Sequence, residues 1–370
     1  MKHILPLSYL VTIPLLFGFS SCKKDPPASI EADILTFSVP DSMQLAPVKV
    51  GTTFVNAFVR NATSSVVSMA PQITISAGAR ITPASGEMVQ FTRSKDNTTM
   101  YEAHYQVESE NRQNTKSYKV TLISPVTQPQ YHFSFDAWDD IVINNGQAVY
   151  QTPSDRMWAT GNPAVAIYIS GKDNPSSYPA SSTTTAVVGR AALLKTVAGA
   201  PQFGAPIAAG NLFWGIFNSG NLAADKLTFT QFGQPFYQKP KTLTGYYQYK
   251  PGITFTDKNN QEVAGRVDSC FIYGIFYETD ENDLTLDGLN IQTSGRIVAK
   301  ALLSNCAATT PENTFVPFSL DFVYTSEPDF INKLYKLTVV FTSSKGGAEF
   351  EGAKGSALIV DEVTLDCSDD

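Results

Sequence analysis

The stretch Tyr101-Glu-Ala-His-Tyr-Gln-Val-Glu108 alternates apolar and polar side chains without a break. A period of two places its apolar residues on one face, which predicts a half-buried β-strand. Tyr118, Val120 and Leu122 repeat the pattern after a polar turn. Short apolar runs separated by turn residues precede both strands, so we predict a compact β-sandwich over residues 30–124, with no chemistry of its own.

The strand pattern continues through the rest of the chain, where no segment holds a helical period beyond a turn or two. Asp268–Glu278 is apolar on both faces, as expected for a central strand covered on both sides. Residues 125–131 contain two prolines and no apolar period, so we place a linker there. We therefore predict an all-β chain: an N-terminal immunoglobulin-like β-sandwich followed by a larger jelly-roll β-sandwich over residues 132–370.

The start of the chain indicates where the protein works. Ser20-Ser21-Cys22 closes an apolar run over residues 4–19. This run is shorter than the roughly 20 residues of a bilayer span, so residues 1–21 are predicted to be a cleaved signal peptide. A cysteine at the cleavage point resembles the lipobox of bacterial lipoproteins, although an ordinary signal with a chance cysteine is the alternative.

From the lipobox resemblance we expect Cys22 to carry a lipid and residues 22–29 to form a short tether. The protein would then be exported and held at the outer membrane or cell surface of a Gram-negative bacterium. The lipid anchor would be its only contact with the membrane.

Composition narrows the class of partner. The 370 residues are too many for one ordinary core, which predicts two domains. Apolar residues make up 43% and charged residues only 16%, so we expect a packed protein with a neutral polar surface. The net charge of −7 argues against nucleic acid as a partner. A neutral polar ligand suits such a surface, and sugars belong to that class.

Seven strings of the larger segment narrow the interpretation further. In order they are Trp158–Asn162, Gly189–Thr196, Ile207–Gly215, Phe232–Phe236, Gly245–Lys250, Ser343–Gly347 and Gly352–Val363. As a set they resemble the putative carbohydrate metabolism domain, a jelly-roll module of surface lipoproteins also called a putative glycoside hydrolase. Residues 73–86 and 118–122 resemble the small immunoglobulin-like leader domains of Gram-negative surface lipoproteins. The resemblance implies a carbohydrate partner and transfers no catalytic residue.

Histidine is too scarce for several kinds of catalysis. The chain contains only His3, His104 and His132. A Ser-His-Asp triad needs an imidazole beside its nucleophile, and the larger segment has one only at its first residue, so we exclude a triad. A histidine-rich zinc or copper site is excluded for the same reason.

Cysteines are equally few. If Cys22 is lipidated, Cys270, Cys306 and Cys367 remain, and no CxxC motif exists, which excludes a cysteine zinc site. In an oxidising envelope two of these thiols can form one disulfide. The alternative is three small buried apolar side chains.

Carboxylates remain as candidates for catalysis. Glycoside hydrolysis needs two carboxyl groups, about 5–5.5 Å apart for retention of configuration or roughly 6.5–9.5 Å apart for inversion. The candidates in strand-rich contexts are Asp136, Asp268, Glu278, Asp321, Asp361 and Glu362. Sequence alone does not pair them.

Asp361 stands apart from the other carboxylates. Strand alternation over residues 357–365 places it on one face with Val363 and other apolar residues, where a carboxylate needs a partner. In many carbohydrate-binding jelly rolls the first and last strands lie together and their acidic residues hold a structural calcium, so the resemblance suggests calcium between Asp136 and Asp361. The alternative is a carboxylate hydrogen-bonded to a loop or to Lys354.

Aromatic residues beside amides suggest a sugar site. A pyranose ring stacks its apolar face on aromatic rings, while amide and charged groups bond its hydroxyls. The residues that offer this mixture near turns are Trp158, Asn162, Asn211, Trp214, Tyr246, Tyr247 and Tyr249. The alternative for each aromatic residue is a place in the core.

Together these observations predict a surface lipoprotein that binds carbohydrate through its C-terminal domain. A glycoside hydrolase using two of the six carboxylates is the alternative enzyme function. A structural or adhesive protein without a sugar ligand is the third hypothesis. The absence of histidine does not separate binding from hydrolysis, since sugar hydrolysis does not require it.

Overall fold

A computed structural model describes residues 27–368, apart from residues 61, 63, 96–98, 126–127, 144–145, 170, 219–224, 281, 283, 304–305, 310 and 312. The predicted signal peptide, Cys22 and the first half of the tether lie outside the described residues. Within the described ranges no helix has the length and hydropathy needed to cross a membrane. Strands account for nearly all regular structure, so the predicted all-β class is confirmed.

Nine strands build the first body of the protein. They are β1 (Ile34–Ser38), β2 (Lys49–Val50), β3 (Phe54–Phe58), β4 (Val66–Met69), β5 (Gln72–Ile75), β6 (Arg80–Thr82), β7 (Val89–Arg93), β8 (Met100–Glu108) and β9 (Thr115–Ile123). One sheet has the order β2-β3-β9-β8-β7-β4, with β6 also paired to β8, and β1 pairs with β5 in a second sheet. β8 and β9 pair antiparallel with Tyr105 opposite Tyr118, and both rings are buried between the sheets. The alternation over 101–108 is therefore confirmed as a half-buried strand.

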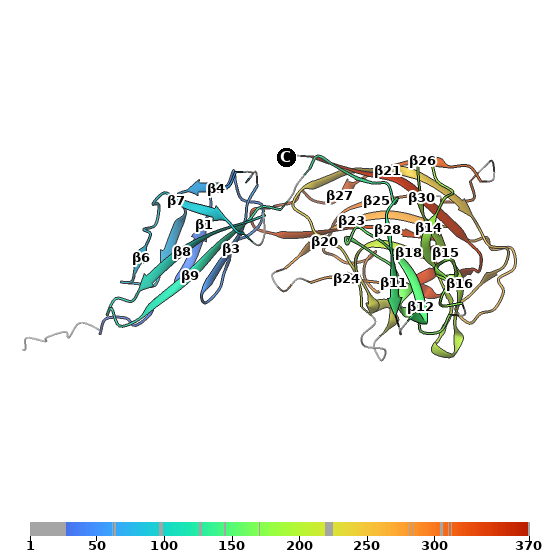
Figure 1. Cartoon of the computed structure of the whole chain (residues 1–370), viewed down its shortest axis with the longest axis horizontal. Coiled ribbons are helices and arrows are strands. Elements are labelled where there is room, and N and C mark those ends of the chain that lie inside the picture. The colour runs from blue at the N-terminus through green and yellow to red at the C-terminus, as the bar shows by residue number, and fades with distance from the viewer. Residues whose placement is uncertain are drawn as a thin grey trace, which may run out of the picture.

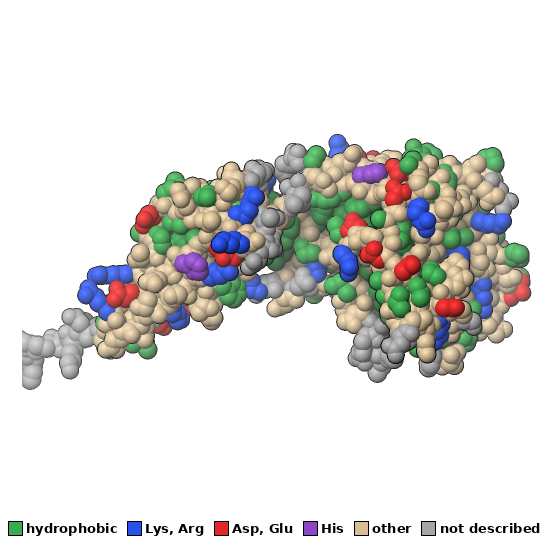
Figure 2. All heavy atoms as spheres, in the orientation of Figure 1, with side chains coloured by type: hydrophobic (Ala, Val, Ile, Leu, Met, Phe, Trp, Pro, Cys, Tyr) green, Lys and Arg blue, Asp and Glu red, His purple; other side chains and the backbone are tan. Residues whose placement is uncertain are grey.

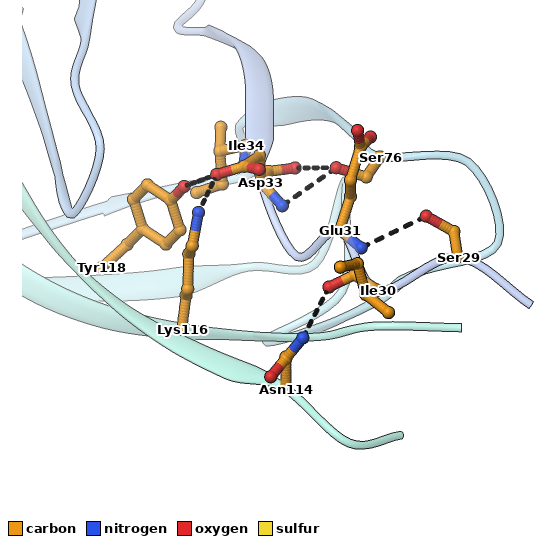
Figure 3. A network of polar contacts seen from close by, with 9 residues as sticks. All are labelled: Ser29, Ile30, Glu31, Asp33, Ile34, Ser76, Asn114, Lys116 and Tyr118. Atoms are coloured by element: carbon orange, nitrogen blue, oxygen red, sulfur yellow. Dashed lines mark hydrogen bonds and ion pairs between the residues drawn. The ribbon is translucent and has the colours of Figure 1, made fainter. Parts of the chain in front are cut away.

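A polar network fastens the entry segment of this body (Figure 3). The carboxylate of Asp33 accepts hydrogen bonds from Lys116 and from the hydroxyl of Tyr118, which in turn accepts from the backbone N–H of Ile34. The Asn114 side chain donates to the carbonyl of Ile30 at 2.9 Å. These contacts attach the first described residues to β9, so the body has a defined N-terminal edge.

The second body is a two-sheet β-sandwich. Its six-stranded sheet contains β14 (Ala180–Thr183), β15 (Ala191–Lys195), β30 (Ala357–Ser368), β21 (Lys239–Lys250), β26 (Val316–Asp321) and β10 (Gln130–Phe133). Its nine-stranded sheet contains β24 (Leu286–Asp287), β19 (Thr230–Phe232), β18 (Asn211–Phe217), β28 (Leu334–Thr342), β23 (Phe271–Thr279), β25 (Ile297–Leu302), β27 (Val323–Tyr324), β13 (Trp158–Ala159) and β20 (Gln234–Pro235). One large core of buried apolar residues fills the space between the two sheets.

Short elements decorate the sandwich. The strand pairs are β11 (Trp138–Ile143) with β12 (Ala148–Pro153), β16 (Val197–Ala200) with β17 (Ala205–Ala208), and β22 (Phe255–Thr256) with β29 (Gly352–Ala353). The helical turns are α1 (Asn162–Val165), η2 (Pro175–Ser177), η3 (Pro201–Phe203), η4 (Lys226–Phe229) and η5 (Gly347–Glu349). A disulfide joins Cys270, just before β23, to Cys306, and Cys367 on β30 lies outside it.

Strand β23 is buried on both faces, as its sequence predicted. Ile272 and Phe276 point into the core between the sheets, while Tyr273, Ile275 and Tyr277 belong to a separate apolar cluster on the other side of the same sheet. β23 lies between β28 and β25, which makes it a central strand. The nine-stranded sheet therefore has a second, outward-facing apolar surface.

Figure 1 shows the two groups of strands as separate bodies. Figure 2 shows both acidic and basic side chains on the visible face of both bodies. The immunoglobulin-like identity of the first body and the exact domain boundary remain predictions.

Candidate functional site

The predicted sugar-binding aromatic residues do not lie on the surface. Trp158, Trp214, Tyr247 and Tyr249 are between 0% and 8% exposed, and all four belong to the core between the two sheets. Trp158 pairs with Trp214 across β13 and β18, and their rings lie 5.8 Å apart. Aromatic side chains bury 150–250 Å² each, so these rings contribute to folding and are closed to a ligand. The prediction of a sugar site on these four residues is wrong.

The remaining residues of that prediction are scattered. Asn162 is fully buried, and its amide bonds the backbone of Gln151 and Ala180, so it is closed to a ligand as well. Tyr246 is 39% exposed because it points away from the core on β21, in the other sheet. Asn211 is half-buried on β18 and accepts a hydrogen bond from Gly161 N–H. Of the seven residues, Asn211 lies in the lining of a large cavity.

That cavity lies on the outward face of the nine-stranded sheet and has a volume of about 640 Å³. Its floor is a row of side chains across three adjacent strands: Phe213 of β18, Val340 of β28 and Tyr273 of β23. Phe213 and Tyr273 each lie opposite Val340 in the strand register, which makes the row continuous. We call this space the outer-sheet cavity.

Loops, short helical turns and strand residues form the walls of the outer-sheet cavity. The apolar wall residues are Val165, Tyr168, Ile207, Phe217, Leu227, Phe229, Phe232, Phe271, Leu289, Ile291 and Phe350. The polar and charged side chains are Asn211, Lys226, Thr230, Gln292, Thr293, Thr342, Ser344, Lys345 and Glu349. An apolar cavity with a few polar groups is the usual form of a small-molecule site in proteins.

Only one carboxylate, Glu349, lies among the described residues that line this cavity. Hydrolysis of a glycosidic bond by the common two-carboxylate mechanism needs a facing partner. None of the six carboxylates predicted from the sequence is in the lining. Glu278 forms an ion pair with Lys333, and Asp321 accepts from the hydroxyl of Thr242. The described lining therefore holds one carboxylate and no facing partner for it.

Asp268 is 3% exposed and bonds Ser344, a residue of the cavity lining. Its Oδ2 accepts hydrogen bonds from Ser344 Oγ at 2.6 Å, Ser356 Oγ at 2.7 Å and Ala353 N at 2.8 Å. Ser344 lines the cavity, and the chain between Ser344 and Ala353 carries Lys345, Glu349 and Phe350 of the wall. One buried carboxylate thus holds both ends of a wall segment.

The two predicted calcium ligands bind the same loop by hydrogen bonds. Asp361 is fully buried, and its Oδ2 accepts from Val187 N at 2.6 Å and Val188 N at 3.1 Å. Asp136 accepts from Arg190 N at 2.7 Å. Burial raises the pKa of the Asp361 carboxyl, while these backbone N–H groups work in the opposite direction. Both carboxylates are thus hydrogen-bonded to a loop, which is the alternative to calcium given above for Asp361.

The predicted face of Asp361 is wrong for a local reason. A β-bulge shifts the register of β30 against β21 near Glu362, whose φ is +50°. The bulge reverses the alternation, so Val363 points into the core while Asp361 points outward to the loop. Among the described residues no group of three His, Cys, Asp or Glu side chains gathers as a metal site. Calcium between Asp136 and Asp361 stays a prediction.

The sequence contained one signal for the cavity that the prediction of the site did not use. β23 was correctly predicted to be covered on both faces, but its outward cover is mostly loop, and the loops leave a space. Phe213 and Phe217 are four residues apart on β18, a spacing that places both on the same face of the strand. That face is opposite to the one that carries the core-facing Trp214. The walls come from segments far apart in the chain, and sequence spacing does not show that they meet.

The chain resembles known proteins both in sequence and in fold. Residues 131–366 match the family described as putative carbohydrate metabolism domain. A putative glycoside hydrolase from Bacteroides thetaiotaomicron VPI-5482 has a crystal structure that superposes with a TM-score of 0.59 at 31% identity, covering 94% of this chain and 100% of that one.

A putative glycoside hydrolase from Bacteroides vulgatus ATCC 8482 superposes with a TM-score of 0.57 at 32% identity, covering 64% of this chain and 98% of that one. Among curated proteins none matches the chain. The family match spans more than half of the chain, and the structural matches agree with it. The chain therefore belongs to the putative carbohydrate metabolism domain family.

Proposed function

We propose that this protein binds carbohydrate in the outer-sheet cavity. The half-buried rings of Phe271 and Phe217 offer apolar faces for stacking, and Asn211 and Thr293 offer groups for hydroxyls. Family membership supports a carbohydrate ligand. The observation that carries the proposal is the continuous apolar floor combined with polar groups along the walls.

Binding is favoured over cleavage because Glu349 is the one carboxylate among the described lining residues. Glycoside hydrolysis is the second candidate, and the two Bacteroides relatives described as putative glycoside hydrolases favour it. The two functions differ in what Glu349→Gln does. For a binding protein, the variant changes affinity and no glycan is cleaved by either form. For a hydrolase, the wild type cleaves the glycan, whereas the variant still binds the glycan and no longer cleaves it.

The binding test uses a soluble chain starting at residue 28 on a glycan array, followed by calorimetry on the best glycan. Phe271→Ala should weaken the affinity about two- to tenfold, since an aromatic stacking contact is worth about 0.5–1.5 kcal/mol. Tyr246→Ala is the matched control, an exposed ring on the other sheet, and should bind like the wild type. Loss of binding in Tyr246→Ala with retention in Phe271→Ala would reject the outer-sheet cavity.

We also propose that the protein is an exported lipoprotein anchored through Cys22. The support is the sequence alone: the short apolar run and the small residues before this cysteine. Metabolic labelling with a fatty-acid analogue should mark the wild-type chain and leave Cys22→Ala unlabelled. Equal labelling of the two proteins would contradict the anchor.

A further inference from the structure

The outer-sheet cavity carries two ammonium groups. Lys226 begins η4 on one wall, and Lys345 begins the segment held by Asp268 on another. Both side chains are exposed, and neither forms an ion pair with a described residue. The lining therefore carries two cations against the single carboxylate of Glu349.

This local charge contrasts with the rest of the molecule. The chain has a net charge of −7, and four lysines elsewhere in its described part are paired with carboxylates. An excess of positive charge in a concave site raises the local concentration of anions and speeds their association. The cavity is thus a positive feature on a negative protein, which points to an anionic ligand.

Lys345 lies where a stacked sugar would be met. Its Nζ is 5.2 Å from the ring centre of Phe271, and Phe271 packs on Tyr273 with ring centres 4.7 Å apart. A cation–π contact at an exposed site is worth about 0.5–1 kcal/mol, so the ammonium group can leave the ring at small cost. A ligand that takes its place on Phe271 gains an ion pair if it carries an anionic substituent.

We propose that the saccharide bound in this cavity is anionic, with a sugar ring on Phe271 and a carboxylate or sulfate ester facing Lys345, while Lys226 supplies further attraction. This inference rests on the proposed function and adds the chemical class of the ligand. A uronic acid and a sulfated sugar share the anionic group, and the experiment separates them.

The experiment measures affinity for three probes by calorimetry: oligogalacturonate, its fully methyl-esterified form, and a sulfated galactan oligosaccharide. We expect an anionic probe to bind and the neutral ester to bind at least fivefold more weakly. Lys345→Gln should weaken anion binding roughly fivefold and Lys226→Gln by less, as expected for exposed ion pairs. Raising the salt concentration should weaken the binding of the anionic probe and leave the affinity for the neutral ester unchanged.

Lys258→Gln is the control, since Lys258 is an exposed lysine in a turn and is not among the lining residues, and it should bind like the wild type. Binding of oligogalacturonate alone identifies a uronate, and binding of the sulfated probe alone identifies a sulfate ester. Equal affinity for acid and ester, unchanged by either lysine substitution but weakened in Phe271→Ala, would overturn the anionic class and keep the proposed function. A glycan array on which acidic and neutral sugars all fail would overturn both.

Discussion

Asp268 and Ser344 are joined by a buried 2.6 Å hydrogen bond from the serine hydroxyl to the carboxylate. The same carboxylate oxygen accepts from Ala353 N, so it connects the two ends of the segment that carries Lys345 and Glu349. A residue without access to the ligand therefore positions groups that line the cavity. From its sequence context Asp268 is a catalytic candidate, whereas its hydrogen bonds indicate a positioning role.

Asp268→Asn should weaken both folding and binding. The amide cannot accept all the bonds of the carboxylate, so we expect a loss of about 2–3 kcal/mol in the free energy of unfolding, measured by urea denaturation. Asp321→Asn is the control, because Asp321 is exposed and accepts from one threonine hydroxyl; its loss should stay under about 0.5 kcal/mol. Similar losses in the two variants would contradict the role assigned to Asp268.

Gly189→Ala tests the loop that Asp136 and Asp361 hold. Gly189 has φ +57°, and an added Cβ would lie 2.1 Å from Asp136 Oδ1, which must then give up its bond to Arg190 N. Gly204 has φ +71° and open space around the same position, so Gly204→Ala pays only the backbone strain. We expect Gly189→Ala to be the less stable variant by about 1 kcal/mol. Equal melting temperatures would show that Asp136 adjusts without cost.

The pH dependence of stability should report the burial of Asp361. Burial raises its pKa above the ordinary 3.8, so the folded protein holds this proton more tightly than the unfolded chain. Its contribution to stability is therefore fully present below 3.8 and is lost as the pH rises through the folded pKa. The difference in unfolding free energy between wild type and Asp361→Asn should change across that interval. A constant difference would show that burial does not shift this group.

Calcium between Asp136 and Asp361 predicts that a chelator lowers the melting temperature and that added calcium restores it, because an ion bound to the folded state stabilises it. Asp361→Asn should then melt at the same temperature with and without chelator. A wild-type melting temperature that chelation does not change would contradict the calcium site. The backbone N–H groups of residues 187, 188 and 190 would then be sufficient partners for the two carboxylates.

Residues 128–370, which keep the whole of β10 and the core contact of Tyr131, should fold alone and unfold cooperatively. The apolar core of the second body shares no residue with that of the first, and the contacts between the bodies include a stacked pair, Phe58 with Tyr237, and a bond from Gln44 to the carbonyl of Ile331. Losing such contacts exposes little surface, so the fragment should keep most of its stability. A molten or insoluble fragment beside a well-folded full chain would place the boundary elsewhere.

The strands were predictable because local alternation determines them, as Tyr101 to Glu108 shows. Which face meets the core is a tertiary property, and Trp158 and Trp214 show the consequence: turn residues nearby suggested the surface, whereas both rings face inward. Asp361 was placed on the wrong face because one bulge changes the phase of the strand. The cavity could not be predicted from the sequence, because its wall residues are far apart in the chain and meet only after folding.

Strands β18, β23 and β28 present the sandwich core on one side and the cavity floor on the other. A substitution on the floor therefore strains the packing beneath it, whereas η4 and the segment after Ser344 change with little effect on the sheet. Changes in ligand preference among related proteins are then expected to come from substitutions at wall positions. A library of variants with randomised wall residues and an unchanged floor should therefore yield new glycan specificities while keeping the fold.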